Sequence, residues 1–276
     1  MASLYYLQPW QLLSLVFLGI VALMLAILWL DQFLAKHHTS PWVRLGVLGS
    51  IGILLFSILY LSQPWPSAIL LELVLRPERY DLGIDLWLHL SLLSDPSLLI
   101  MLVVIMGIWL VVHGQQQWLV WLVACLVLCL ATVFSLQQWL QVSPPASMIG
   151  RTLNFSLPSG AITGFALIAA LVSMTLTRQW PDLKQNFQAL AALSVALAAL
   201  AKLYLGFHWL TDVLASLALS LILYVCCLAC FRLLKLEQSS FRLWQGPLIW
   251  LLIITVYSHQ LSFALYYKLD YIRLLS

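Results

Sequence analysis

Long apolar stretches separated by short polar segments recur along the whole chain. Each stretch is close to the roughly 20 apolar residues that an α-helix needs to cross the hydrocarbon core of a bilayer. The pattern predicts eight transmembrane helices, over residues 11–34, 43–63, 96–112, 117–136, 160–177, 187–204, 212–234 and 246–266. No soluble domain fits between these segments, so the expected fold is that of an all-α polytopic integral membrane protein.

The longest gap between predicted spans, residues 64–95, is not uniformly polar. Its charged first part is followed by residues 82–93, where Asp85 and His89 lie one helical turn apart among Leu, Ile and Trp. This pattern is typical of a helix that lies in the membrane interface. Asp85 and His89 form either the solvated face of that helix, which is the interpretation we favour, or a catalytic pair.

Composition supports the membrane interpretation and excludes several classes of protein. A soluble domain is about 25% charged, whereas this chain is 8% charged and 63% hydrophobic, with a mean hydropathy of +0.99. A net charge of +3 without a basic cluster argues against a nucleic-acid partner. The five cysteines all lie in apolar runs, which indicates packing thiols, and we predict neither a metal site nor another cofactor.

The distribution of basic residues predicts an orientation. Short loops next to span ends on one side of the membrane collect most of the bases that direct orientation, namely Lys36, Arg44, Arg178, Lys184, Arg232, Lys235 and Arg242. Such bases favour the cytoplasmic side, so both termini and residues 137–159 and 205–211 are expected to face outward. The expected location is a bacterial inner membrane.

Two outward segments do not resemble ordinary loops. Residues 157–161 read Leu-Pro-Ser-Gly-Ala and open a predicted span, and residues 201–212 join two spans. Ser159 and Gly160 would offer backbone N–H groups at a helix N-terminus, which favours an anion. His208 and Asp212 lie one helical turn apart, so the carboxylate could orient the imidazole as a nucleophile or base. Lys202 adds a cation, and the combination indicates phosphate chemistry.

These residues resemble the motifs of the type 2 phosphatidic acid phosphatases, a family related to vanadium haloperoxidases. The family pattern Ser-Arg, five residues, His, three residues, Asp is similar to Ala201-Lys202 followed by His208 and Asp212. Its Pro-Ser-Gly-His pattern is similar to residues 158–161, where Ala161 replaces the histidine. Its Lys, six residues, Arg-Pro pattern is met only in outline by residues 137–145.

The resemblance implies a metal-free site in which His208 attacks phosphorus and Asp212 orients it. It further implies that Lys202, Ser159 and Gly160 bind phosphate, while Gln137 and Pro144 stand where clamp cations are expected. Arg151, the one base between residues 137 and 159, is either a replacement clamp or an interfacial arginine, and the second reading is favoured. His89 is a further candidate for the lost proton donor.

The implied architecture is a six-helix core over residues 43–235, with additional transmembrane helices in residues 1–42 and 236–276. Loss of the leaving-group acid and of clamp cations indicates a catalytically impaired protein. It would bind a membrane lipid phosphate or serve as an accessory subunit of a membrane-protein complex. The alternative is an active lipid phosphatase or phosphotransferase with a rearranged site, acting on phosphatidic acid or a polyprenyl diphosphate.

Overall fold

The computed structural model describes residue 51 and residues 84–142, 155–205, 207–236 and 243–275 of the chain. Two predicted spans, 11–34 and 43–63, lie outside the described residues, as does the candidate residue Arg151. Within the described ranges all regular structure is helical. All-α architecture is therefore confirmed for this part of the chain.

The described residues form seven α-helices and one short 3₁₀ helix. In chain order these are α4 (Ile84–Leu92), α5 (Pro96–Val112), α6 (Gln116–Leu140), α7 (Gly160–Gln179), η4 (Pro181–Leu183), α8 (Lys184–Tyr204), α9 (Leu210–Leu233) and α10 (Gly246–Leu275).

Six of the eight predicted spans are confirmed as helices, α5 to α10, that are long and apolar enough to cross a membrane. Their outward positions carry large apolar side chains that water would not tolerate in such numbers. Val104, Ile108 and Ile254, for example, are each more than half exposed. Side chains of this kind are stable where the surroundings are lipid tails. The chain is thus a polytopic integral membrane protein.

The start of each of three helices is fixed by a polar side chain. Asp95 caps α5 by accepting a bond from the Ser97 N–H at 2.8 Å, and Pro96 occupies the first helical position, where no N–H is needed. Ser159 caps α7, and the Asp212 carboxylate accepts the Trp209 N–H at the start of α9. Each cap places an ionisable or hydroxyl group at a helix N-terminus.

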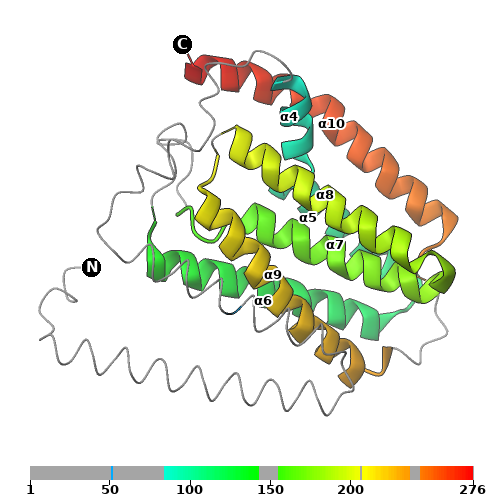
Figure 1. The fold of residues 1–276 in the computed structure, drawn as a ribbon. Coiled ribbons are helices and arrows are strands. Elements are labelled where there is room, and N and C mark those ends of the chain that lie inside the picture. The colour runs from blue at the N-terminus through cyan, green and yellow to red at the C-terminus, as the bar shows by residue number, and fades with distance from the viewer. Residues whose placement is uncertain (1–50, 52–83, 143–154, 206, 237–242, 276) are drawn as a thin grey trace, which may run out of the picture. The chain divides into compact units, whose positions relative to one another are not determined.

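The helices α7 and α9 form the centre of the described bundle (Figure 1). Half of the most apolar part of α9 and 39% of that of α7 is buried, against 17–22% for the other spans. α7 packs against α5, α6, α8 and α9, and α10 packs along α4 and α5. Successive spans alternate in direction, so the first residues of α7 and α9 and the last of α6 and α8 meet at one end.

An aromatic cluster fills the core where α6 begins and α9 ends. Trp118, Trp121 and Phe231 make mutual edge contacts with ring centroids 5.3–5.9 Å apart. The Trp121 Nε1–H donates to the Cys227 carbonyl oxygen at 2.9 Å, which gives the buried indole its polar partner. This contact fixes α6 against α9 at the end away from Ser159.

The segment predicted as an interfacial helix forms α4, and it covers the connection between α8 and α9. Leu88 is buried against Leu205 and Phe207. Trp87 stacks on Tyr204 with ring centroids 4.8 Å apart. α4 therefore packs over the segment that carries His208.

We predict that Trp121→Phe lowers the thermal unfolding midpoint of the purified protein. The change removes a buried hydrogen bond and packed volume, together worth about 1–3 kcal/mol. Size-exclusion chromatography of heated samples measures the midpoint. Trp139→Phe is the matched control, because Trp139 is 68% exposed on the same helix. Equal midpoints for the two variants would contradict the proposed role of the cluster.

Candidate functional site

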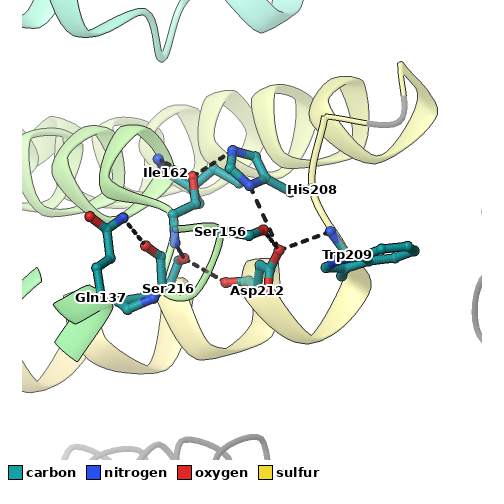
Figure 2. A network of polar contacts seen from close by, with 9 residues as sticks. Gln137, Ser156, Ile162, His208, Trp209, Asp212 and Ser216 are labelled. Carbon is teal, nitrogen blue, oxygen red and sulfur yellow. Dashed lines mark hydrogen bonds and ion pairs between the residues drawn. The ribbon is translucent and has the colours of Figure 1, made fainter. Parts of the chain in front are cut away.

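The imidazole of His208 faces the N-terminus of α7. Its Nε2 atom lies 2.9 Å from the Ser159 Oγ, a hydrogen-bond distance across two segments that are 49 residues apart in the chain (Figure 2). His208 is half-buried, with 20% of its side chain exposed. The structure thus brings together the two outward segments on which the predicted phosphate site depends.

Asp212 lies fully buried below His208, on the first turn of α9. Its Oδ2 atom accepts the Trp209 N–H at 3.0 Å and a hydrogen bond from the Ser156 hydroxyl. The His208 Nδ1 stands 3.8 Å from the same oxygen, which is an ion-pair distance but too long for a hydrogen bond (Figure 2). Ser156 therefore occupies the place on Asp212 that the imidazole would need.

Two polar atoms of this pair remain unused within the described part of the chain. The His208 Nδ1 and the Asp212 Oδ1 are buried and have no hydrogen-bond partner there. Burying such atoms unpaired is costly. The two residues are nevertheless neighbours, one turn apart, so these two atoms are the groups that a hydrogen bond fixing the imidazole tautomer would use.

A second chain of bonds ties the α7 N-terminus to α9. The Ser159 N–H donates to the Ser216 Oγ at 2.8 Å, and that hydroxyl donates to the Asp212 carbonyl oxygen. The Ser159 N–H is therefore already engaged, although the sequence predicted it as a free donor for an anion. An ideal Cβ on Gly160 would lie 3.4 Å from the Val133 side chain, so this glycine allows α6 and α7 to approach closely.

Lys202 lies at the end of α8, and its side chain is half-buried. Its ammonium group stands 5.3 Å from the ring centroid of Phe207, a cation–π distance. The buried carboxylate of Asp95 also attracts the positive charge of the Lys202 ammonium. Within the described part of the chain, no hydrogen bond or ion pair joins the Lys202 ammonium to Ser159 or His208. Lys202 is thus near the site but directed toward α4 and α5.

Gln137 has a structural contact at the position where the resemblance predicts a lysine. Its Nε2–H donates to the Pro158 carbonyl oxygen at 2.8 Å, which fixes the loop that leads into Ser159 (Figure 2). A neutral amide can make this bond without adding charge to the site. The other candidate proton donor, His89, lies on α4, where its Nδ1 contacts the Gln260 Oε1 at 3.0 Å on the exposed surface.

A second buried polar cluster, formed by Asp95, Ser97 and His259, was not predicted from the sequence. The Ser97 hydroxyl contacts both the Asp95 carboxylate and the His259 Nε2, which lies 2.9 Å away on α10. His259 is 2% exposed and stands 3.5 Å from the Asp95 Oδ1. A histidine inside the predicted span 246–266 was the available signal, because ionisable residues within membrane spans have a partner or a function.

No group of three potential metal ligands occurs among the described residues. Cys125, Cys129 and Cys227 are buried and Cys230 is half-buried, whereas Cys226 is exposed on α9. The first four agree with the predicted packing role, and Cys226 departs from it because it lies on the outer face of α9.

Comparison with known proteins supports the resemblance. No protein-family model matches the chain. Over 93 residues it is 29% identical to phosphatidylglycerophosphatase B of Bacillus subtilis, which covers 32% of this chain and 46% of the relative. The chain therefore spans about half the length of the curated relative that it matches. The similarity to a lipid phosphatase agrees with the resemblance to the type 2 phosphatidic acid phosphatases that the motifs carry.

A comparison with solved structures finds the crystal structure of a transmembrane PAP2-type phosphatidylglycerolphosphate phosphatase from Bacillus subtilis. The match covers 80% of this chain and 98% of that chain. The sequence identity is 22% and the TM-score is 0.46.

We predict that Ser216→Ala destabilises the end of the bundle where His208 meets Ser159. The change leaves the Ser159 N–H buried without an acceptor, which costs about 1–3 kcal/mol. Thermal unfolding in detergent measures the loss. Ser220→Ala is the matched control, since Ser220 lies one turn further along α9 and donates only to its own helix, at the Leu217 carbonyl. A smaller loss for Ser216→Ala than for Ser220→Ala would contradict the assigned bond.

Proposed function

We propose that this protein binds the phosphate group of a membrane lipid at the end of the bundle where His208 meets Ser159, and that it turns the lipid over poorly. The observation that carries the proposal is the 2.9 Å contact between the His208 Nε2 and the Ser159 Oγ at the N-terminus of α7. A phosphate oxygen that replaces the Ser159 hydroxyl would meet both the imidazole and the positive end of the helix dipole.

The roles within the site follow from the positions of the side chains. His208 stands where a nucleophile would face phosphorus, and Asp212, fully buried beside it, is the group that orients the imidazole. Ser159 and Gly160 supply the helix N-terminus, and Lys202, near the site, supplies positive charge. Arg151, outside the described residues, is proposed from the sequence alone as a second source of positive charge. No metal or other cofactor is needed, because an imidazole nucleophile and cationic groups suffice for phosphoryl transfer to a histidine.

Impaired turnover follows from what the site lacks. Ala161 stands where a leaving-group acid is expected, and general acid catalysis is worth about 10²–10⁴-fold. Gln137 carries no charge and is held by the Pro158 carbonyl, so it cannot replace a clamp lysine. Lys202 offers a point charge instead of the planar fork of an arginine. These losses weaken the stabilisation of a transferring phosphoryl group far more than they weaken ground-state binding.

The proposed organisation keeps residues 43–235 as the phosphatase-like core, with the additional helices in residues 1–42 and 236–276. Basic residues at the helix ends, such as Arg178 in the last turn of α7 and Lys184 at the start of α8, support placing that end of the bundle in the cytoplasm. The His208 end then faces the extracytoplasmic side of a bacterial inner membrane, where it would meet lipid headgroups.

Two other functions have support of their own. The name phosphatidylglycerophosphatase B, carried by the curated relative, favours an active lipid phosphatase that uses a rearranged site. An accessory subunit of a membrane complex is favoured by α10, whose outer positions such as Trp250, Ile254 and Leu261 offer a long apolar face. The experiments below separate these functions from phosphate binding.

Binding is tested with the full-length protein in detergent. Orthovanadate, a phosphate analogue, and short-chain phosphatidic acid are expected to raise the thermal unfolding midpoint. His208→Ala and Lys202→Ala should each abolish the increase. His113→Ala and Lys184→Ala are the matched controls, because His113 bonds to the Trp109 carbonyl at the opposite end and Lys184 is exposed at the start of α8. An unchanged midpoint in the wild-type protein would contradict the proposal and favour the accessory subunit.

Turnover is tested by release of inorganic phosphate from phosphatidic acid, phosphatidylglycerophosphate and a polyprenyl diphosphate. The wild-type protein should release little more than His208→Ala. Ala161→His restores a proton donor beside the leaving group, and in a Gln137→Lys, Lys202→Arg background it should raise release about 10²-fold. Efficient release by the wild-type protein that disappears in His208→Ala would instead establish the active enzyme.

A further inference from the structure

An apolar cavity of about 580 Å³ lies within the membrane-spanning part of the bundle, apart from His208. It is enclosed by α5, α6, α7 and α10, and representative lining residues are Val103, Met106, Trp121, Cys125, Leu171 and Val256. From Gly164 to Thr175 its wall extends about 16 Å along α7, at about 1.5 Å per residue. That is about half of the roughly 30 Å hydrocarbon thickness of a bilayer.

Hydrogen bonds attach α10 to the bundle just before its first residue and again near its middle, on either side of the cavity. At one end Trp244 donates through Nε1 to the Thr175 hydroxyl at 3.0 Å, and its backbone exchanges two bonds with the Gln179 amide. Near the middle of the helix His259 contacts Ser97 at 2.9 Å. α10 packs against α4 and α5, and α6 and α7 form the far wall of the cavity.

One side of the cavity is open toward the surroundings. Ile253 and Tyr257 line it on α10 and are nevertheless 51% and 68% exposed. Leu122 and Leu126 line it on the facing side, along α6. The opening therefore lies between α10 and α6, at a depth where lipid tails surround the protein.

Water molecules would find few hydrogen-bond partners in this cavity. The polar groups at its two ends are already engaged, since the Gln260 amide bonds to the Nδ1 and the carbonyl of His89, and the Thr175 hydroxyl bonds to Trp244 and to its own helix. A buried water needs two to four polar partners, and between these ends the described wall residues are apolar except for Tyr257 at the opening. An empty cavity of this size would in turn destabilise the fold.

We infer that this cavity binds one hydrocarbon chain of a membrane lipid, which enters between α6 and α10. Its volume falls within the range of about 300–1,000 Å³ typical of ligand pockets with apolar walls. The inference is independent of phosphate binding at His208.

The test uses the full-length protein in lipid nanodiscs with a photoreactive diazirine at the end of an acyl chain. Phosphatidylcholine and phosphatidic acid carrying that chain, and a photoreactive polyprenyl phosphate, form three arms. In at least one arm, crosslinks in the wild-type protein should concentrate on cavity residues such as Val103, Met106 and Val256. The preferred arm identifies the lipid that supplies the chain.

Val103→Trp fills the cavity and should abolish these crosslinks, while Val104→Trp should preserve them, because Val104 is 52% exposed on the adjacent outward position of α5. Val256→Trp provides a second filling variant from α10, and gel filtration confirms that each variant is folded. His208→Ala should leave crosslinking of phosphatidylcholine unchanged. In all arms, crosslinks spread evenly over outward residues such as Val104 and Ile254, or unaffected by both filling variants, would overturn the inference.

Discussion

The contact between the His208 imidazole and the Ser159 hydroxyl joins the N-termini of the two most buried helices, α7 and α9, and the polar end of the bundle is organised around it. Serine side chains on both helices supply the remaining bonds, with Ser156 on the Asp212 carboxylate and Ser216 on the Ser159 N–H. In a bilayer such bonds matter because unpaired polar groups near hydrocarbon are costly. α4 then covers the same segment through Leu88 and Trp87, so the position of His208 is fixed from two sides.

The same bonds that build the site also limit its chemistry. The Asp212 Oδ2 atom accepts hydrogen bonds from the Ser156 hydroxyl and the Trp209 N–H. The His208 Nδ1 lies 3.8 Å from the same oxygen and lacks the hydrogen bond that would orient the imidazole. The Gln137 side-chain amide donates a hydrogen bond to the Pro158 carbonyl oxygen. Each of these contacts stabilises the loop at Ser159. Each also engages a side chain that could otherwise bind a phosphate or orient the imidazole. An arrangement of this kind favours holding an anion over transferring it, which agrees with the replacement of the expected acid by Ala161.

Apolar length alone predicted the six described spans, because hydrocarbon thickness sets a minimum that few other structures satisfy. Alternation of direction then placed residues 157–161 and 201–212 at one end, so the meeting of Ser159 and His208 was also predictable. The pairing of Asp95 and Ser97 with His259 was not, since these residues are more than 160 positions apart and no periodicity links them. The engagement of the Ser159 N–H by Ser216 was equally hidden, because a serine inside an apolar helix gives no sign of its partner. The apolar cavity depends on the spacing between α10 and its neighbours, which only three-dimensional packing determines.

Direct proximity between a lipid phosphorus atom and the His208 imidazole is the central claim of this account. Solid-state NMR of the protein with ¹⁵N-labelled histidine, in bilayers that contain phosphatidic acid, measures dipolar coupling between ³¹P and the ring nitrogens. The account predicts a coupled imidazole signal, one of those from the six histidines of the chain, that disappears in His208→Ala and persists in His113→Ala. A His208 signal with no coupling to phosphorus, in bilayers where the protein is folded and saturated with the lipid, would contradict it.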